Sequence, residues 1–304
     1  MNVTRRRFVI GSVAGVVSWA TPLFGAPAAA IGATRPIPSS GERLPLVGLG
    51  SSITFNVGDD RQLQEECAAV IAAFLAGGGK LIDSSPMYGS SQPTIGYGLR
   101  KQGSLNVFSA DKVWTADTEG GVAQVERSRQ AWGVPQFDLL QVHNLLAWEA
   151  HLPLLFKMKA AGKLRYVGIT TSHGRRHDDI EAVMRTNPID FLQITYNVLD
   201  RDVEERILPL AQERNIAVII NRPFQRGALI NKLKGETLPP FAAEIGATSW
   251  AQFLLKFIIS HPAVTCAIPA TSRVDHVREN LGAAGGALPD EALRQKMAAY
   301  VKDL

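Results

Sequence analysis

Short, largely apolar runs alternate with helical patterns eight times along this chain of 304 residues. Runs of this kind are typical of parallel strands that are buried on both faces of a sheet. The eight predicted strands span residues 46–50, 80–84, 107–113, 138–143, 164–170, 191–196, 217–221 and 265–269. The helical patterns span residues 63–77, 92–102, 121–132, 151–162, 177–187, 202–214, 248–260 and 273–284, and a further amphipathic pattern covers 290–304.

Eight successive strand–helix units predict an α/β fold, a (β/α)8 TIM barrel with one extra C-terminal helix. We expect residues 31–304 to form this barrel as a single domain, because α/β barrels often reach this size as one unit. A doubly wound sheet is the alternative, and it would place a G-x-G-x-x-G turn after its first strand. The sequence GLGSS at 48–52 does not continue in that way, which favours the barrel.

The first 30 residues differ in composition from the rest of the chain. They include Arg5, Arg6 and Arg7 but no Asp, Glu or Lys. Taking these three from the 32 basic residues leaves 29 against 28 acidic residues, so most of the formal net charge of +4 belongs to this leader. The segment TRRRFVI at 4–10 resembles the twin-arginine signal of bacterial export.

Uncharged residues continue from Phe8 to Thr34, diluted by glycine and proline. Small residues at Ala26, Ala28 and Ala30 offer cleavage sites, and we expect cleavage close to Ala30. An uncleaved membrane anchor is the alternative, since the run is long enough to span a bilayer. The leader therefore predicts a signal peptide at 1–30, the twin-arginine export machinery as a partner, a periplasmic or otherwise exported location, and no stable membrane anchor.

Four residues that can hold or move protons fall at or just after the ends of neighbouring predicted strands. Asp83 lies near the end of the second strand, and Tyr88 follows in its loop. Lys112 lies near the end of the third strand, and His143 ends the fourth. In a (β/α)8 barrel these strand ends meet at one rim, where the active site lies. Each residue alone also has an ordinary structural explanation, such as a turn cap or a buried histidine.

Together the four residues have the chemistry of a proton-transfer site. Free tyrosine and lysine both titrate near pH 10, so neither exchanges protons readily at neutral pH. A cationic Lys112 beside Tyr88 would lower the pKa of the phenol, and Asp83 would hold the ammonium in place. His143 would hydrogen-bond a substrate carbonyl oxygen. Tyr88 would then be the general acid of a reduction and the general base of the reverse oxidation.

The same segments resemble the aldo-keto reductase family. Residues 82–89, IDSSPMYG, are similar to its signature, in which Asp and Tyr are separated by four residues. The segments KVW at 112–114 and LQVHN at 140–144 are similar to its lysine and histidine segments. The resemblance extends from Leu46 to the C-terminus. It implies the barrel fold, a nicotinamide cofactor and a catalytic tetrad of Asp83, Tyr88, Lys112 and His143.

The family pattern also implies the residues around the nicotinamide. They are Gly50, Ser51, Thr170, Thr171, Gln193, Asn221, Arg222, Pro223 and Phe224. Gln193 matches the residue that hydrogen-bonds the carboxamide, whereas Thr171 stands where the family has an amide side chain. Asn221 replaces the aromatic residue that stacks on the nicotinamide, and the planar guanidinium of Arg222 could cover the ring instead.

At the other end of the cofactor the implied residues follow the eighth strand. They are Ala270, Thr271, Ser272, Arg273, His276, Glu279 and Asn280. Glu279 and Asn280 match the adenine contacts, but Ala270 and His276 replace the Lys and Arg of the 2′-phosphate site. A helix start near Arg273 offers backbone N–H groups and a guanidinium to a phosphate. NADP(H) is therefore favoured as the cofactor, with NAD(H) as the alternative.

These features predict an exported, NADP(H)-dependent oxidoreductase that reduces an aldehyde or ketone to an alcohol, or catalyses the reverse reaction. A regulatory or sensor module that binds a nicotinamide nucleotide but has lost catalysis is the alternative. The departures from the family pattern and the lack of NADPH regeneration in the periplasm favour that alternative. A cofactor-free isomerase is a third hypothesis, against which Gln193, Glu279 and Asn280 argue.

Other features of the sequence have structural explanations. The run RRH at 175–177 is followed by Asp178 and Asp179, which predicts a mixed-charge surface turn. Basic residues are not interleaved with aromatic ones, so we expect no nucleic-acid partner. Cys67 and Cys266 lie in apolar patterns without the spacing of metal ligands, and we expect no metal site.

Overall fold

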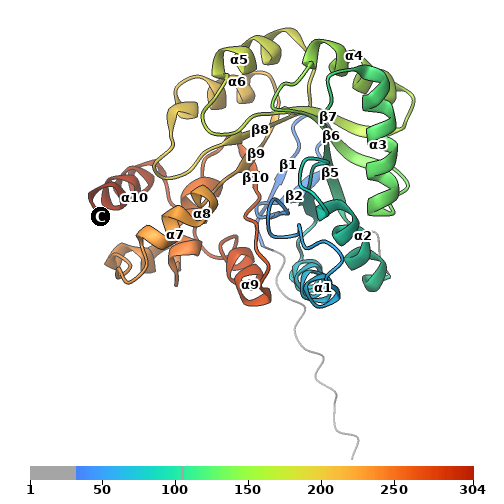
Figure 1. Ribbon diagram of the computed structural model, residues 1–304. Coiled ribbons are helices and arrows are strands. Elements are labelled where there is room, and N and C mark those ends of the chain that lie inside the picture. Colours follow the sequence, from blue (N-terminus) through green and yellow to red (C-terminus); the bar gives the residue numbers. More distant parts are fainter. Residues whose placement is uncertain (1–31, 104–105) are drawn as a thin grey trace, which may run out of the picture.

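The structure of the protein is a computed structural model that describes residues 32–103 and 106–304. The predicted signal peptide lies outside the described residues. Eight parallel strands form a nearly closed barrel with helices packed around it (Figure 1). In order around the barrel they are β3 (Leu49–Gly50), β4 (Leu81–Asp83), β5 (Phe108–Val113), β6 (Phe137–His143), β7 (Leu164–Thr170), β8 (Phe191–Thr195), β9 (Ala217–Asn221) and β10 (Val264–Ala267). Parallel bridges from Val47 to Ala267 and from Gly50 to Ala270 join the first and last strand segments, so the predicted (β/α)8 barrel is confirmed.

The helices lie close to where the sequence predicts them. They are α1 (Arg61–Ala76), α2 (Ser91–Gln102), α3 (Thr118–Trp132), α4 (Trp148–Ala160), α5 (His177–Thr186), α6 (Ile207–Glu213), α7 (Ala228–Lys232), α8 (Trp250–Ile259), α9 (Val274–Gly282) and α10 (Glu291–Asp303). In α1 the Asp60 side chain caps the first turn by accepting a hydrogen bond from the N–H of Leu63. Cys67, Ile71 and Phe74 lie on the buried face of the same helix.

Two parts of the helical layer differ from the prediction. The helix expected at 202–214 is divided into a 3-10 turn, η1 (Asp202–Glu204), and α6. Pro209 is consistent with the break, because proline lacks an N–H and favours the first turn of a helix, where it lies in α6. Between β9 and α8 the chain also forms η2 (Gln225–Gly227), α7 and η3 (Pro240–Ile245), where the sequence pattern predicted no helix.

The N-terminal end of the barrel is covered by a hairpin that the sequence pattern did not predict. Strands β1 (Thr34–Pro36) and β2 (Arg43–Pro45) pair antiparallel. Ile37 and Leu44 are fully buried, and they pack in one cluster with inward-facing residues of the barrel, among them Phe108 and Phe191. Strands of three residues are too short to show a clear period in the sequence.

Inward-facing residues change from apolar to polar along the barrel strands. Alternate residues of a strand face the same side, so the inward positions can be read from the register. Leu81, Ala110, Leu139, Tyr166, Phe191 and Ala217 form the lower, apolar layer. Asp83, Lys112, His143, Thr170, Gln193 and Asn221 follow at even spacing on the same strands. The polar residues are thereby gathered at the C-terminal rim.

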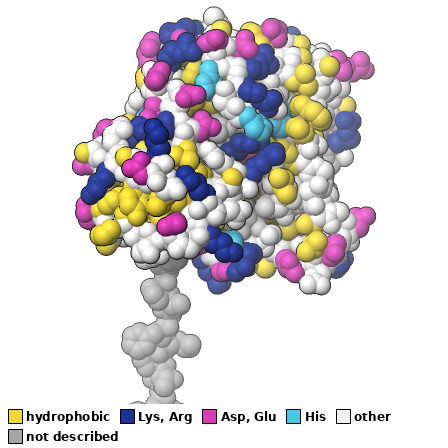
Figure 2. Space-filling model, turned by 60° about the vertical axis from the view of Figure 1, so that its left-hand side comes forward, with side chains coloured by type: hydrophobic (Ala, Val, Ile, Leu, Met, Phe, Trp, Pro, Cys, Tyr) yellow, Lys and Arg dark blue, Asp and Glu magenta, His cyan; other side chains and the backbone are white. Residues whose placement is uncertain are grey.

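The outer surface carries charges of both signs. Figure 2 shows Lys and Arg side chains interspersed with Asp and Glu side chains over one face of the molecule. In the described part of the chain, no helix is long and apolar enough to cross a membrane. Cys67 and Cys266 are both buried and unpaired.

Candidate active site

A buried ion pair between Asp83 and Lys112 forms the base of the site. Lys112 Nζ lies 2.6 Å from Asp83 Oδ2 and 2.7 Å from the carbonyl oxygen of Ser84. The side chains of the pair are 0% and 3% exposed. Burial alone would lower the pKa of the Lys112 ammonium, but Asp83, Tyr88 and Asp111 together outweigh it and the pKa is raised. Lys112 is therefore a fixed positive charge below the rim.

The Asp83 carboxylate is satisfied by further buried donors. Gln193 Nε2 donates to Asp83 Oδ1 at 2.7 Å, and Gln141 Nε2 lies 3.3 Å from the same oxygen. Ser51 Oγ lies 2.9 Å from the Asp83 carbonyl oxygen. A buried carboxylate with several donors has little freedom to move, so Asp83 holds Lys112 in one position.

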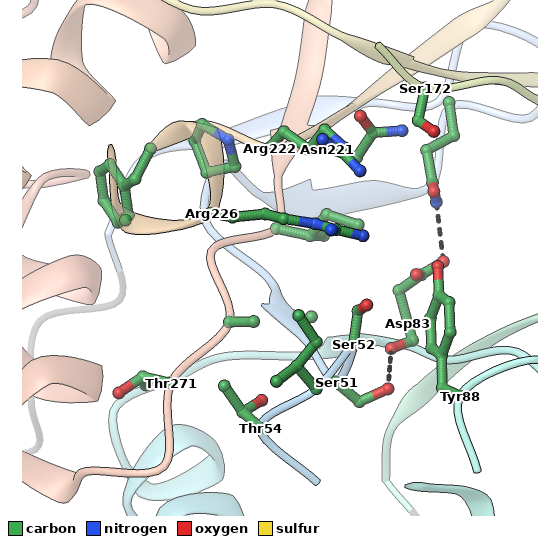
Figure 3. Close-up of a pocket in the computed structure, with 18 of the residues that line it drawn as sticks. Ser51, Ser52, Thr54, Asp83, Tyr88, Ser172, Asn221, Arg222, Arg226 and Thr271 are labelled. Carbon is green, nitrogen blue, oxygen red and sulfur yellow. Dashed lines mark hydrogen bonds between the residues drawn. The ribbon is translucent and has the colours of Figure 1, made fainter. Parts of the chain in front are cut away.

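Tyr88 lies directly above this pair. Lys112 Nζ is 5.2 Å from the centroid of the Tyr88 ring, and Figure 3 shows Tyr88 and Asp83 next to each other at one side of the pocket. Burial raises the pKa of the Tyr88 phenol, and the Lys112 charge only partly opposes this effect. The expectation that Lys112 brings this pKa below its ordinary value therefore does not hold in this state, because desolvation of the phenolate outweighs the attraction.

His143 is held by a residue that the sequence analysis did not select. Its Nδ1 lies 2.8 Å from Ser85 Oγ, and the ring packs edge-on against Tyr88 with centroids 5.7 Å apart. The N–H of Met87 donates to the same Ser85 oxygen at 3.2 Å. Burial, followed by the Lys112 charge, lowers the pKa of His143 to about 3. His143 is thus neutral, and in the tautomer in which Ser85 donates to Nδ1, Nε2 carries the N–H.

A cavity of about 690 Å³ opens above these groups. Sixteen of the twenty site residues selected from the sequence line it: Gly50, Ser51, Asp83, Tyr88, His143, Thr170, Gln193, Asn221, Arg222, Pro223, Phe224, Ala270, Thr271, His276, Glu279 and Asn280. Lys112 lies beneath the cavity wall, and Thr171, Ser272 and Arg273 do not line it either.

At the inner end of the cavity, two residues that were expected to contact the cofactor have their polar groups buried or hydrogen-bonded within the protein. The Thr171 hydroxyl is buried and has no hydrogen-bond partner among the described residues. The Asn221 amide donates to the Thr171 carbonyl at 2.9 Å and accepts from Thr195 Oγ1 at 2.7 Å. Because both ends of this amide are engaged, Asn221 braces two neighbouring strand ends.

At the outer end, Arg273 does not face the cavity. Its guanidinium pairs with Asp275, and the two side chains are 63% and 61% exposed. Ser272 is also exposed. The Arg273 guanidinium therefore pairs with Asp275 and is not directed into the cavity, and the phosphate site at the start of α9 stays a prediction.

The structure adds residues to the site that the sequence did not single out. Ser85 contacts His143, and Gln141 contacts Asp83. Both residues lie in segments that resemble the family pattern. The inward register of β6 could have identified Gln141, since it lies two residues before His143. Arg175 and Arg226 line the cavity from loops, where no periodic signal exists.

A buried Asp–Lys pair beneath a tyrosine and a neutral histidine, at the carboxyl rim of a (β/α)8 barrel, defines an oxidoreductase that acts on carbonyl or alcohol groups. The model of the aldo/keto reductase family matches residues 47–300, and the chain therefore belongs to that family.

Known proteins of the family resemble the chain over most of its length. It is 29% identical over 247 residues to the methylglyoxal reductase YeaE of Escherichia coli, which covers 78% of this chain and 84% of YeaE. An aldo-keto reductase of Klebsiella pneumoniae, solved in complex with NADPH, superposes with a TM-score of 0.71 at 23% identity and covers 86% of this chain and 93% of its own. The glycerol dehydrogenase AKR11B4 of Gluconobacter oxydans gives a TM-score of 0.74 at 21% identity and covers 88% and 94%.

Proposed function

We propose that this protein is an NADPH-dependent reductase of small aldehydes or ketones. The observation that carries the proposal is the fixed Lys112 ammonium beneath Tyr88, held by Asp83 at 2.6 Å. Burying two charges costs desolvation free energy, so a buried ion pair is seldom kept for stability alone. Its position beneath Tyr88 is what points to a role in proton transfer. NADPH is supported by the Klebsiella structure, which was solved with that nucleotide.

The residues present fit a nicotinamide dinucleotide. One cavity joins the catalytic groups to Glu279 and Asn280, and its volume is in the range of small-molecule sites. Asn280 is buried, and its side-chain amide makes no hydrogen bond to a described residue. Gln193 and Thr170 would face the nicotinamide end, and Glu279 and Asn280 the adenine end. The cofactor supplies the hydride when it is bound.

The side chains of this chain would then handle the proton. His143 Nε2 would donate a hydrogen bond to the substrate carbonyl oxygen and orient it, because Ser85 occupies Nδ1. The Tyr88 hydroxyl would give its proton to that oxygen as the alcohol forms. Lys112 would stabilise the phenolate that is left, while Asp83 keeps the ammonium in place.

Replacing Tyr88 with Phe tests this assignment. We expect kcat for NADPH-dependent reduction of methylglyoxal and simple aldehydes to fall about a hundred- to ten-thousand-fold. The Kd for NADPH, measured by quenching of protein fluorescence, should stay within about twofold. Tyr97→Phe is the matched control, since Tyr97 bonds Glu65 on the outer surface. Wild-type turnover in the Tyr88 variant contradicts the assignment, and a wild-type protein that retains nucleotide but reduces no carbonyl supports the sensor module instead.

We also propose that the leader exports the folded protein to the periplasm. Arg5, Arg6 and Arg7 followed by an uncharged stretch support this proposal. Cell fractionation should find the protein in the periplasm, and replacing all three arginines with Lys should retain it in the cytoplasm. Equal distribution of both versions contradicts the proposal.

A further inference from the structure

Three arginines line the cavity near the catalytic groups, and we call them the arginine cluster: Arg175, Arg222 and Arg226. Arg175 lies in the loop after β7, and the other two lie in the loop after β9. Figure 3 shows the Arg226 side chain crossing the pocket toward the side on which Asp83 and Tyr88 lie. The segment 175–177 is an exposed, mixed-charge surface turn as expected, and its Arg175 also lines the cavity.

The arginine cluster forms no direct ion pair with a described residue, although the Asp200 carboxylate attracts Arg222, and Arg175 and Arg226 are exposed to solvent. Neither Arg222 nor Arg226 forms a side-chain hydrogen bond or ion pair with a described residue. Arg175 has only polar contacts, at 3.2 Å to His173 Nδ1 and 3.4 Å to the carbonyl oxygen of Ser172. The adjacent Arg176, in contrast, pairs with Asp179 at 2.8 Å.

The positive charges in the cavity act on one another. Burial and then the charge of Arg226 lower the pKa of Arg222, and Arg175 contributes in the same direction. Burial followed by the charges of the arginine cluster also lowers the pKa of His173. Like charges gathered in a concave site raise the local concentration of anions.

The backbone places two of these arginines in an unusual conformation. Arg222 has φ 52° and Arg226 has φ 58°, and His173 has φ 68°. Residues other than glycine rarely adopt this left-handed region, and when they do they cluster at functional sites. The loops thus hold the charges over the cavity at a conformational cost.

Acidic groups compensate the cluster only in part, and Asp200 acts on Arg222 from outside the cavity lining. Asp83 and Glu279 are the acidic residues that line it among the described residues. Asp83 is engaged with Lys112, and Glu279 lies on α9, at the adenine end. Arg175 follows β7, which the strand order places three positions from β10. A group bound by Arg175 therefore lies away from α9, whereas Arg222 and Arg226 follow β9, the neighbour of β10.

We propose that the arginine cluster binds a carboxylate or phosphate group of the substrate, so that the preferred substrates are anionic carbonyl compounds. This inference rests on the proposed reductase function. Guanidinium groups suit both anions because they donate paired hydrogen bonds to two oxygens. The anion would be held by the arginine cluster while the carbonyl group reaches Tyr88 and His143.

Matched probes test the inference. With saturating NADPH, kcat/KM should be about tenfold or more higher for 4-carboxybenzaldehyde than for its neutral methyl ester, and the difference should shrink as salt is added. Glyceraldehyde 3-phosphate compared with glyceraldehyde shows whether phosphate is preferred to carboxylate. Arg175→Gln and Arg226→Gln should each lower kcat/KM for the anionic probes about tenfold while changing that for the neutral probes less than threefold. Arg185→Gln, a variant of an arginine paired with Glu181 on α5, should change neither.

Three outcomes would overturn the inference, and they are distinguishable. Equal kcat/KM for anionic and neutral probes rejects the arginine cluster as an anion site but leaves the reductase function intact. A rise in the Kd for NADPH in both variants, with equal losses on all probes, assigns the arginines to the cofactor. If no probe is reduced, the reductase function is rejected. The anion site is then tested separately by calorimetry, which compares the Kd of terephthalate with that of its dimethyl ester. An equal or higher Kd for terephthalate rejects the anion site.

Discussion

The two ends of the cavity are built in different ways. At the inner end the polar side chains stand on barrel strands, are buried and hydrogen-bond one another, as in the Asp83–Lys112 pair at 0% and 3% exposure. At the outer end the polar side chains stand on a loop and on α9, and Arg273 is 63% exposed and paired with its neighbour Asp275. The barrel therefore holds the catalytic side chains in a buried network, whereas Arg273 at the outer end is exposed and paired only with a neighbour in the chain.

The largest predicted effect comes from comparing two Lys–Asp ion pairs that have the same N–O distance. Lys112 and Lys159 each lie 2.6 Å from an aspartate, but their side chains are 0% and 37% exposed. Lys112→Met should lower the free energy of unfolding by about 3–5 kcal/mol, because it leaves the Asp83 carboxylate buried without a counter-charge. Lys159→Met should cost less, because water reaches this pair from the lysine side and the buried Asp190 keeps a hydrogen bond from the N–H of Val167. Urea unfolding monitored by circular dichroism measures both, and equal losses would contradict the contrast.

A second prediction concerns Asp111, which faces outward from β5 behind Lys112. Its carboxylate accepts from Gln92 Nε2 and from the N–H of Lys112, both at 2.7 Å. Burial raises its pKa to about 7, from 3.8 in an exposed carboxyl. Between these values the folded state holds a proton that the unfolded state has lost, so stability should fall as pH rises from about 4 to about 7.

The size of that change is a few kcal/mol, by about 1.4 kcal/mol for each unit of pKa shift. Asp111→Asn should remove this part of the pH dependence, while the exposed Asp59→Asn should retain it. Urea unfolding midpoints measured from pH 4.5 to pH 8 compare the two variants. The same slope in both would reject the buried, protonated carboxyl.

A third prediction tests the hydrogen bond between Ser85 and His143 at the inner end of the cavity. Ser85→Ala leaves His143 Nδ1 without its partner, so both ring tautomers become populated and Nε2 is no longer always the donor. We expect kcat to fall about tenfold, equivalent to 1.4 kcal/mol, with the Kd for NADPH unchanged. Ser85→Thr should restore most of the rate, because it keeps a hydroxyl. Ser84→Ala is the control, since the Ser84 hydroxyl meets Ser51 and not His143; a loss there as large as in Ser85→Ala would reject the role of the hydrogen bond.

The smallest predicted effect is at the outer end. Arg273→Gln should change the KM for NADPH less than threefold, and stability by less than about 0.5 kcal/mol, because an exposed ion pair contributes little. A tenfold rise in the KM for NADPH with no change for NADH would show that Arg273 turns to the 2′-phosphate when the nucleotide binds. That outcome would restore the prediction made from sequence.

The fold and the inner end of the site could be predicted because both follow from strand periodicity. Asp83, Lys112 and His143 occupy inward positions near strand ends, and closure of the barrel brings those positions together. Arg175 and Arg226 could not be selected, since loops have no period that relates a residue to the cavity. The hairpin of β1 and β2 was missed because strands of three residues carry too little pattern.

The pairing of Ser85 with His143 was missed for another reason. The family pattern identified the two segments that contain these residues, but a hydrogen bond from the loop after β4 to the end of β6 depends on how that loop turns. Likewise, Lys112 was expected to lower the pKa of Tyr88, and only the burial of the phenol reverses that result. A sequence shows which charged groups are present, but the burial that shifts their pKa values depends on how the chain packs.

The hairpin at the floor of the barrel also determines where additions to the chain are tolerated. Arg35 in β1 donates to the carbonyl oxygens of His261 and Ile259, at 2.8 Å and 3.2 Å, on the loop before β10 and at the end of α8. The described chain therefore joins the barrel at the end opposite the cavity mouth. An affinity tag or fluorescent protein fused ahead of residue 32 would leave substrate entry open, whereas insertions in the loops after β7 or β9 would reshape it.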